Sequence, residues 1–504
     1  MAPRTIKQLF EIAPANVLNY LNVFAGAINR FSSSKHLFME RTIIKDLKDH
    51  KGSEVTIMGW VHTTRDQGKM AFFDFRDFSG KVQGVVFSKP DVLEVAKTLR
   101  PEFVVAITGM VNERPEKMVK EGVLNGDLEL EITCIEILNT AETAPFEIDK
   151  STAGKDEEVR LKYRDLDLRT ERMQHNIRTR SEFVRRCRNF LMERDFCEIE
   201  TPLLTESTPE GSRDFVVPSR HNPGAFYALP QSPQQYKQLL MNAGFERYVQ
   251  IARAIRDEDL RADRGYEHTQ IDVEMSFVTE EQVRAIIEEM ITTTVESMGY
   301  TIKEKPFPVV TYKESMEKYG ADKFDLRTEE DRENGVLAYA WVVDFPFFEK
   351  TDKGDWTFTH NPFSMPKEEF IDDLLKGENI ENIIAQQYDL VCNGFEAGGG
   401  SIRSHRTDVI KAVYKVMGNT DEQIEEKIGH MLREFQFGTP PHGGIALGVE
   451  RNVMNLTGED YLREVQAFPM TRNGQTAVMT APKPLSLEQL LELGLSVTKK
   501  KDGE

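Results

Sequence analysis

The sequence contains few cysteines, fewer basic than acidic residues, and no long apolar stretch. Its four cysteines, Cys134, Cys187, Cys197 and Cys392, are scattered and form no C-x-x-C pair, which disfavours a structural zinc site or a disulfide framework. The longest apolar stretch, residues 17–28, contains two asparagines and is too short to span a bilayer. Lys and Arg number 64 against 83 Asp and Glu, a net charge of −19, so the chain is not an obvious nucleic-acid binder as a whole.

Two nucleotide-binding signatures are also absent. No G-x-x-x-x-G-K-[ST] loop occurs, which excludes a P-loop site, and no G-x-G-x-x-G occurs, so a Rossmann site lacks its fingerprint. What is present is an ordinary soluble composition, 39% hydrophobic and 29% charged, in 504 residues, long enough for roughly three domains. Residues 160–190 carry ten basic and four acidic side chains; they form either a solvated helix face or a patch that meets a polyanion.

The N-terminal segment, residues 1–39, differs in composition from the rest. It is basic and contains a serine run, and Glu11 is its only acidic residue. It is typical either of an organelle-targeting peptide or of sequence upstream of a natural start at Met39. We therefore expect a cytoplasmic protein, with organelle targeting as the alternative.

Residues 40–142 are expected to form a small β domain. Strand-like runs cover 55–61, 71–77, 81–87, 102–111 and 128–138, with a helix predicted over 91–99. Five short strands and one helix favour a closed barrel of OB type, which often binds single strands by stacking. A purely structural β domain fits the pattern equally well. Residues 143–160, which contain Pro145 and Gly154, predict a linker or hinge.

Beyond the linker, two consecutive strands give the clearest physical signal. In residues 269–277 the polar Gln270, Asp272 and Glu274 share one face, and apolar residues share the other. The preceding strand, 248–256, ends in Arg256 and alternates with small alanines that leave room for a ligand. The densely charged loop between the strands is either a solvated hairpin tip or a grip on a phosphate chain and a metal.

A glycine-rich segment, residues 395–403, lets the backbone approach a ligand closely. The nearby carboxylates of Asp389 and Glu396 have opposite parity along the chain. A regular strand would separate them, so we expect a bulge near Asn393–Gly394 to bring them together. A plain flexible turn is the alternative.

A third segment, residues 443–451, presents Gly444, Ala446 and Gly448 on one strand face. Such a flat surface suits a planar base, and Arg451 at the start of the next helix suits a phosphate. Close packing of strand and helix is the alternative.

In this order, the segments resemble the class II aminoacyl-tRNA synthetases. Residues 190–204 look like motif 1, residues 245–274 with Arg256-Asp257-Glu258 look like motif 2, and residues 444–451 look like motif 3. Within subclass b, residues 208–214 and 231–237 are similar to the bacterial-type aspartyl-tRNA synthetases. The likeness spans roughly residues 40–495 and implies an α+β protein. Its parts would be an OB-fold anticodon domain, a catalytic domain over 161–495 built on an antiparallel sheet flanked by helices, and a charged tail, 496–504.

The resemblance implies a role for each matched residue. ATP binding would involve Arg256, Glu258, His268, Glu396 and Arg451, with Arg256 on the α-phosphate and Arg451 on the γ-phosphate as the catalytic pair. Magnesium would be held by Asp389 and Glu396. Aspartate would be bound by Glu210, Ser232, Gln234, Lys237, Gln270, Asp272, His360 and Arg403. The anticodon would be read by Arg65, Gln67, Phe72, Gln83 and Glu129.

The implied activity is the attachment of L-aspartate to tRNA(Asp) in two steps, aspartyl-adenylate formation from ATP with Mg²⁺ and then transfer to the terminal adenosine. Lys237 and Arg403 would select the side-chain carboxylate, because asparagine would leave both cations buried without an anion, a cost of about 2–5 kcal/mol. The adaptable amide of Gln67 favours dual use of tRNA(Asp) and tRNA(Asn). Motif 1 implies a homodimer.

Three departures from the family pattern stand out. The large domain that bacterial members insert between motifs 2 and 3 is essentially missing and leaves a remnant near 305–340. His268 stands where a stacking Phe is usual and could titrate. The usual His-His pair is His360-Asn361, which puts a role for Asn361 in doubt.

Two other functions compete with this interpretation. The same activation chemistry could serve ammonia as acceptor, although the barrel has no purpose for so small an acceptor. A non-catalytic tRNA-binding paralogue is the other alternative. It would have lost the charged residues, yet Arg256, Glu258, Asp389, Glu396 and Arg451 are all present.

Overall fold

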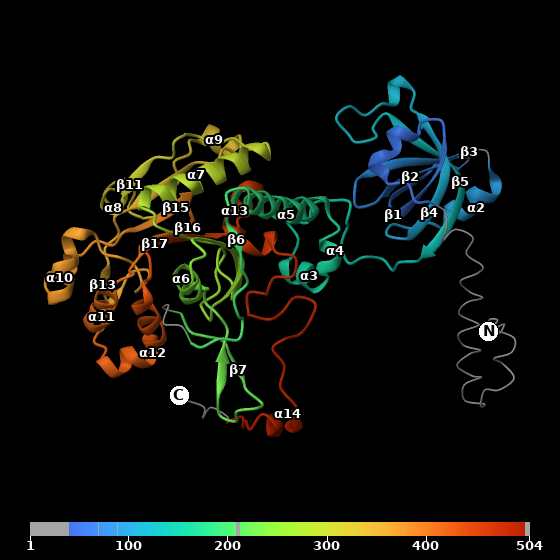
Figure 1. Cartoon of the computed structure of the whole chain (residues 1–504). Helices are drawn as coiled ribbons and strands as arrows, with labels where there is room; N and C mark the ends of the chain where they lie inside the picture. Colours follow the sequence, from blue (N-terminus) through green and yellow to red (C-terminus); the bar gives the residue numbers. More distant parts are fainter. Residues whose placement is uncertain (1–39, 69, 88, 208–211, 499–504) are drawn as a thin grey trace, which may run out of the picture. The chain divides into compact units, whose positions relative to one another are not determined.

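The computed structural model describes residues 40–68, 70–87, 89–207 and 212–498. The expectations for residues 1–39, for Glu210 and for most of the charged tail therefore fall outside the described residues. The chain divides into two compact units whose boundary lies between Asp149 and Lys150 (Figure 1). Among the described residues, none of the helices has both the length and the apolar content that crossing a membrane requires.

The first unit is a closed five-stranded barrel with strand order β1-β2-β3-β5-β4. Its strands are β1 (Glu54–Asp66), β2 (Met70–Arg76), β3 (Lys81–Phe87), β4 (Val104–Glu113) and β5 (Leu128–Asn139). In β2 the side chains alternate strictly between the buried interior and the outer surface, as period-2 patterning requires. The OB-type barrel expected from the sequence is confirmed.

Short helices close the barrel core. η2 (Ile44–His50) and α2 (Pro90–Thr98) do so, whereas η3 (Glu116–Met118) has no buried residue. Ile44 and Leu47 of η2 and Ala96 of α2 are buried in the same apolar cluster as the inward faces of the strands. η2 and α2 therefore complete the apolar interior of the barrel.

The second unit is built on an eight-stranded sheet, ordered β11-β12-β15-β16-β17-β10-β9-β6. The strands are β6 (Cys197–Glu198), β9 (Arg247–Ile255), β10 (Glu267–Ser276), β11 (Val309–Thr311), β12 (Tyr339–Val343), β15 (Gln387–Cys392), β16 (Phe395–Arg403) and β17 (His442–Gly448). The six inner strands are antiparallel, as expected. At the two edges, β6 and β11 pair in parallel with their neighbours, because each edge strand returns to the sheet through a long connection.

Helices cover one face of this sheet, and a continuous apolar core lies between the helices and the sheet. α5 (Glu171–Met192), α7 (Glu280–Ser297) and α13 (Val449–Thr457) pack there against the apolar sides of β10, β12, β15 and β17. On the other face lie α6 (Gln234–Asn242), α11 (Thr407–Val416) and α12 (Asp421–Glu434) (Figure 1). The polar sides of β9, β10, β16 and β17 point to this second face and leave a cleft.

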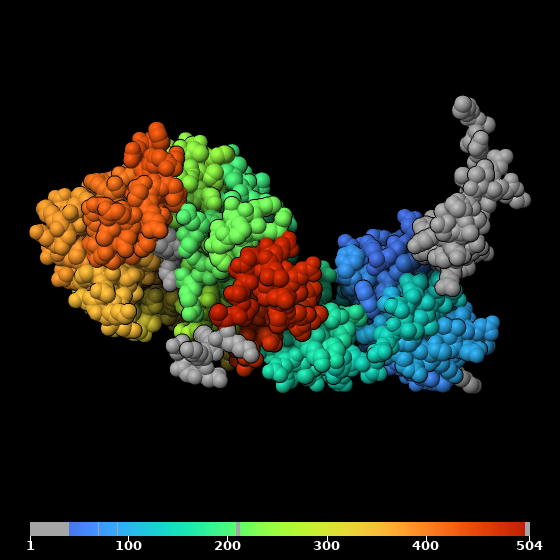
Figure 2. Space-filling view, turned by 90° about the horizontal axis from the view of Figure 1, so that it is seen from below, coloured from blue at the N-terminus to red at the C-terminus, as the bar shows by residue number. Residues whose placement is uncertain are grey.

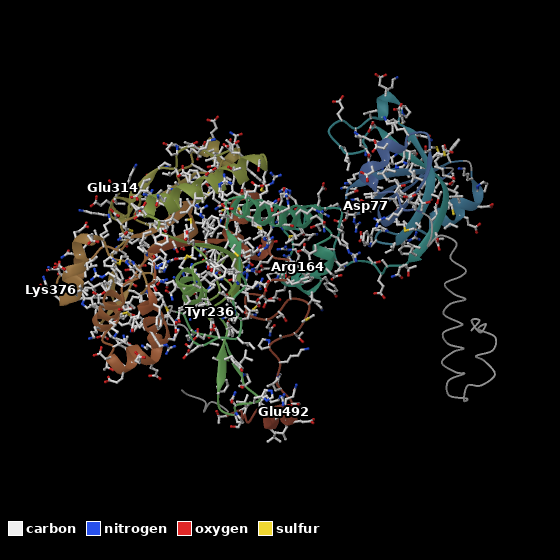
Figure 3. The ribbon with its side chains drawn as sticks, viewed as in Figure 1. Asp77, Arg164, Tyr236, Glu314, Lys376 and Glu492 are labelled. Carbon is white, nitrogen blue, oxygen red and sulfur yellow. The ribbon has the colours of Figure 1, made fainter. Side chains whose placement is uncertain are left out.

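The remaining elements surround the sheet. They are α3 (Glu157–Lys162), α4 (Arg164–Asp167), β7 (Val216–Pro218), β8 (Phe226–Ala228), α8 (Tyr312–Tyr319), α9 (Glu329–Glu333), β13 (Phe348–Lys350), β14 (Trp356–Phe358), η4 (Glu368–Phe370), α10 (Ile371–Lys376), η5 (Ile380–Asn382), η6 (Phe435–Phe437), η7 (Leu462–Val465) and α14 (Leu487–Glu492). In the space-filling view the orange residues of α11 and α12 adjoin the green residues around α6 (Figure 2). Glu492 of α14 lies 3.7 Å from Arg220 in the β7–β8 hairpin (Figure 3).

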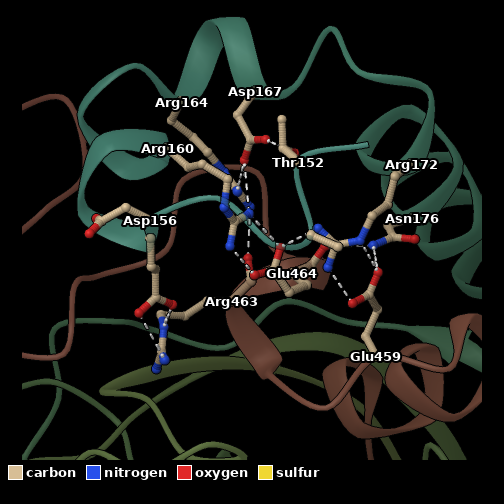
Figure 4. A network of polar contacts seen from close by, with 12 residues as sticks. Thr152, Asp156, Arg160, Arg164, Asp167, Arg172, Asn176, Glu459, Arg463 and Glu464 are labelled. Carbon is tan, nitrogen blue, oxygen red and sulfur yellow. Dashed lines mark hydrogen bonds and ion pairs between the residues drawn. The ribbon is translucent and has the colours of Figure 1, made fainter. Parts of the chain in front are cut away.

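A buried ionic network anchors η7 to the start of the second unit (Figure 4). Arg160 Nη2 donates to Glu464 at 2.6 Å, and Arg164 Nη1 donates to Asp167 at 2.6 Å. Arg164 also donates to the carbonyl oxygens of Arg463, Gln466 and Ala467. η7 also contacts the charged loop between β9 and β10. The backbone N–H of Leu462 donates to Ala262 O at 2.9 Å. The network thus fixes one wall of the cleft.

Candidate functional site

The cleft on the polar face of the sheet has a volume of about 300 Å³. Eleven of the residues singled out in the sequence line it: Ser232, Gln234, Lys237, Arg256, Glu258, His268, Gln270, His360, Glu396, Arg403 and Arg451. They come from α6, β10, β16, α13 and the loops that follow β8, β9 and β14. Asp272 and Asp389 are buried beneath its floor, and Glu210 is outside the described residues.

One end of the cleft holds a buried set of two cations and two carboxylates. Lys237 Nζ lies 2.6 Å from Asp272 Oδ1 and 3.2 Å from Glu274 Oε2, and Arg403 Nε lies 3.2 Å from Glu274 Oε1. All four side chains are at most 4% exposed. Glu274 was placed on the correct strand face by its periodicity, but its position between the two cations depends on contacts across distant elements.

This arrangement corrects the argument about asparagine. Lys237 and Arg403 each keep a protein carboxylate partner, so neither depends on a ligand for its counter-ion. Burial raises the pKa of Asp272, against the pull of Lys237, whereas the pKa of Glu274 is lowered because Arg403 and Lys237 outweigh its burial. The set is electrically balanced without a bound molecule.

Several polar groups at this end still point toward a ligand. Lys237 has three donors, of which two are directed at Asp272 and Glu274, and Arg403 uses three of its five N–H groups on Glu274, Ser401 and the Gly444 carbonyl. Among the described residues, Gln270 Oε1 and Asp272 Oδ2 are buried acceptors without a hydrogen-bond donor. The site therefore offers donors to an anion and acceptors to a cation within one small space.

The floor of this end depends on a close backbone approach. A Cβ on Gly444 would lie 2.0 Å from Val273 O and 2.3 Å from Glu274 Oε2. Only glycine fits at position 444, because a side chain would overlap the Val273 carbonyl and the buried Glu274 carboxylate.

The other end of the cleft collects arginines from the charged loop and from α13. Arg256 Nε donates to Gln231 O at 3.2 Å, and its Nη1 lies 4.0 Å from Glu258. Arg451 Nη2 donates to Asp263 at 3.0 Å. The side chains of Arg256 and Arg451 are 33% and 20% exposed, so both can turn toward an anion that enters from solvent.

Two carboxylates meet at the centre, although not by the expected route. Asn393 and Gly394 form a two-residue hairpin turn with positive φ at both positions. The register shift lies further along, where Leu390 pairs with Gly398 and Val391 pairs with Glu396. The expected location of the bulge was therefore wrong by three residues, since Ala397 is the extra residue.

The bulge brings the two carboxylates to the same side of β16. A Cβ on Gly399 would lie 2.9 Å from Asp389 Oδ1 and 3.4 Å from Glu396 Oε1. Burial raises the pKa of Asp389 to about 7. Glu396 is only partly buried, and Arg451 and Lys323 hold its pKa at about 2. One carboxyl of the pair is ionised and the other takes up its proton near neutrality.

His268 lies on β10 beside the arginines. Burial, together with Arg256, Arg451 and Arg253, lowers its pKa to about 3. The sequence alone did not decide whether this imidazole titrates near neutral pH. Because its pKa lies so far below 7, the ring is expected to be neutral over the physiological range. A neutral planar ring is suited to stacking on a base.

The loop after β14 supplies His360 and Asn361. The His360 ring meets Phe345 edge-on at 4.7 Å between centroids. Asn361 Oδ1 accepts from the Phe363 amide at 2.7 Å, so Asn361 stabilises the turn at the rim of the cleft.

On the barrel, the expected anticodon residues gather on one outer strip. Arg65 pairs with Phe72 across β1 and β2, and Gln83 pairs with Glu129 across β3 and β5. Gln67 lies in the turn between β1 and β2, where its backbone N–H donates to Met70 O at 2.9 Å. Asp74, which was not singled out in the sequence, accepts from Thr63 Oγ1 at 2.6 Å and lies 3.5 Å from Arg65.

Comparison with known families agrees with both units. Residues 156–472 match the family described as tRNA synthetases class II (D, K and N). Residues 55–138 match the OB-fold nucleic acid binding domain.

Curated relatives share most of the chain. The aspartate–tRNA(Asp/Asn) ligase of Rubrobacter xylanophilus is 39% identical over 572 aligned positions, which cover 88% of this chain and 95% of the relative. That of Corynebacterium diphtheriae is 39% identical over 585 positions, covering 90% and 97%. Since this chain has 504 residues, at least 572 − 504 = 68 positions of the first alignment have no counterpart here, which agrees with a missing inserted segment.

Solved structures show the same fold at low identity. An aspartyl tRNA synthetase from Entamoeba histolytica superposes with a TM-score of 0.68 at 22% identity, covering 86% of this chain and 91% of that one. An asparaginyl-tRNA synthetase from Pyrococcus horikoshii, complexed with asparaginyl-adenylate, gives 0.69 at 22% identity, covering 86% and 98%.

Proposed function

The chain belongs to the class II tRNA synthetases of the D, K and N group, and from this premise we propose how it works as an aspartate–tRNA ligase. The aspartate α-carboxylate attacks the α-phosphorus of ATP, the bond to pyrophosphate breaks, and aspartyl-adenylate remains bound. A ribose hydroxyl of the terminal tRNA adenosine then attacks the activated carbonyl, and AMP leaves. The observation that carries this proposal is the cleft itself, with a balanced cation–carboxylate set at one end and arginines at the other.

Aspartate binding follows from the donors and acceptors that remain at the first end. The side-chain carboxylate accepts from the remaining N–H groups of Lys237 and Arg403, and the α-ammonium donates to Gln270 Oε1 and Asp272 Oδ2. Ser232, Gln234 and His360 line the same space, and Glu210 completes the set implied by the family. Because both cations keep their own carboxylates, discrimination against asparagine depends on charge-assisted hydrogen bonds worth about 1.5–3 kcal/mol.

ATP binds at the second end. Arg256 neutralises the α-phosphate and holds the attacking carboxylate, Arg451 holds the γ-phosphate, and Glu258 and His268 support the nucleotide. None of these groups forms a covalent bond with substrate, so they accelerate the reaction by positioning and by neutralising charge.

Asp389 and Glu396 fit a magnesium ion that arrives with ATP. Asp389 Oδ2 is a buried oxygen without a hydrogen-bond donor, and the bulge directs Glu396 to the same spot. Within the described ranges, no set of three or more His, Cys, Asp or Glu side chains could hold a metal. Two carboxylates suit Mg²⁺, which keeps waters and substrate phosphates as its other ligands. When bound, the ion supplies charge neutralisation at the polyphosphate.

The barrel reads the anticodon through Phe72 as a stacking platform and through Arg65, Gln67, Gln83 and Glu129 as polar contacts. Both curated relatives are named for tRNA(Asp) and tRNA(Asn) together, which supports use of both tRNAs here. Charging purified tRNA(Asp) and tRNA(Asn) with labelled aspartate tests this. A preference above about a hundredfold in kcat/KM for tRNA(Asp), roughly 2.7 kcal/mol, would reject dual use.

A homodimer through motif 1 is supported by apolar side chains exposed along that segment. Met192, Leu203 and Leu204 are 51%, 49% and 53% exposed, and β6 lies at the edge of the sheet. Sedimentation at micromolar concentration tests this, and a monomer would refute it.

The enzyme is expected to act in the cytoplasm, with organelle targeting by residues 1–39 as the alternative. Fusing this segment to a fluorescent reporter distinguishes the two.

A further inference from the structure

Lys323 reaches the carboxylate pair from the short segment that connects α8 to β12. Its Nζ lies 2.9 Å from Glu396 Oε2. The segment is anchored at the hairpin turn beneath it, because the Gly394 amide donates to Phe324 O at 3.1 Å. Phe324 is buried and stacks on Tyr319 at 4.3 Å. These contacts fix the backbone next to Lys323, so that its side chain extends to Glu396.

The ammonium of Lys323 competes for a carboxylate oxygen that other cations also approach. Glu396 Oε2 lies 3.5 Å from Arg451 Nη1, whereas Glu396 Oε1 is directed to the Asp389 side. A divalent cation on Glu396 would bring a second positive charge within a few ångströms of Nζ, a strong repulsion in a partly buried site. A cation on the Asp389 side of this carboxylate therefore weakens the hold of Glu396 on Lys323.

The lysine is able to move away when this happens. Its side chain is 33% exposed, and a four-carbon stem with a point charge can redirect its donors without a fixed geometry. Under the proposed function, the anion that brings the cation into the cleft is the polyphosphate of ATP. The displaced ammonium thus has a partner of opposite charge within reach.

We propose that Lys323 is a phosphate-positioning residue that occupies Glu396 when no nucleotide is bound and turns to the polyphosphate when ATP enters with its cation. This inference rests on the proposed function, since it takes Asp389 and Glu396 as the cation site. Lys323 should then have opposite effects on two measurable quantities. It lowers the affinity for the divalent cation when no nucleotide is bound, and it raises the affinity for ATP.

The test uses Mn²⁺ in place of Mg²⁺ and the full chain with Lys323→Met. Free Mn²⁺ is titrated by electron paramagnetic resonance without nucleotide, and the KM for ATP is measured by pyrophosphate exchange. We expect Mn²⁺ to bind roughly three- to tenfold more tightly to the variant and the KM for ATP to rise by about tenfold. Lys323→Arg should restore both values in part. Lys313→Met, on the exposed side of α8, is the matched control and should change neither.

Unchanged or weaker Mn²⁺ binding by Lys323→Met would overturn the inference while leaving the proposed function intact. Glu396→Gln separates this result from a failure of the cation site itself. If Glu396→Gln binds Mn²⁺ as the unmodified chain does, both the cation site and the role of Lys323 are refuted.

Discussion

Replacing Lys237 with methionine tests the amino-acid end of the cleft. Lys237→Met keeps the length of the side chain but removes the ammonium that lies 2.6 Å from Asp272 and 3.2 Å from Glu274. The balanced set of two cations and two carboxylates then carries an excess negative charge, which repels the aspartate side chain. Breaking such a buried pair costs about 2–5 kcal/mol, roughly thirtyfold to several thousandfold in kcat/KM for aspartate. The KM for ATP should change less than about threefold, since the arginines that we propose to hold ATP are at the other end.

A second variant separates binding from folding. Lys237→Met combined with Asp272→Asn restores electrical balance around Arg403 and Glu274, so thermal stability should recover while aspartate activation stays lost. ATP–pyrophosphate exchange with aspartate and ATP varied in turn measures both KM values. An unchanged KM for aspartate in Lys237→Met would refute the assignment, as would full recovery of activity in the double variant.

Four further outcomes follow from the structure. Gly399→Ala would place a methyl group 2.9 Å from Asp389 Oδ1, so exchange should require more than about tenfold higher Mg·ATP with unchanged circular dichroism; wild-type kinetics would contradict this. Because burial raises the pKa of Asp389 from 3.8 to about 7, the folded chain favours the protonated carboxyl, and this group's contribution to stability falls as pH rises from about 4 to 7. Mn²⁺ affinity, which needs the ionised form, should fall below about pH 7, and Asp389→Asn should abolish that dependence. Phe72→Ala should raise the KM for tRNA by roughly five- to a hundredfold, the cost of one lost stack, without changing pyrophosphate exchange. Arg164→Met leaves Asp167 buried with one cation fewer, and urea unfolding should show a loss of about 3–5 kcal/mol; a change under about 0.5 kcal/mol would contradict the importance of the network.

The sequence predicts those features that depend on local periodicity. The barrel strands follow from alternation, since Ala71, Phe73 and Phe75 point inward and Phe72 outward. The polar face of β10 follows in the same way. Such patterns are set by neighbours along the chain, so no tertiary contact is needed to interpret them.

Features set by distant contacts were missed or misplaced. Glu274 bridges Lys237 and Arg403 only because α6, β10 and β16 meet at one point. The bulge at Ala397 and the approach of Lys323 likewise depend on strand register and on a connection between elements. Local sequence places Glu274 on the polar face of its strand, but it carries no signal for these contacts, because each depends on residues that are far apart in the chain.

Amino-acid-dependent ATP–pyrophosphate exchange tests the central claim most directly. The purified full chain is assayed with ATP, Mg²⁺ and each of the standard amino acids in turn, without tRNA. The arrangement of Lys237, Arg403, Asp272 and Glu274 predicts exchange with aspartate, and asparagine should be weaker by roughly ten- to a hundredfold, the value of a charge-assisted hydrogen bond. Exchange that is absent with aspartate, or equally fast with asparagine, would contradict the account.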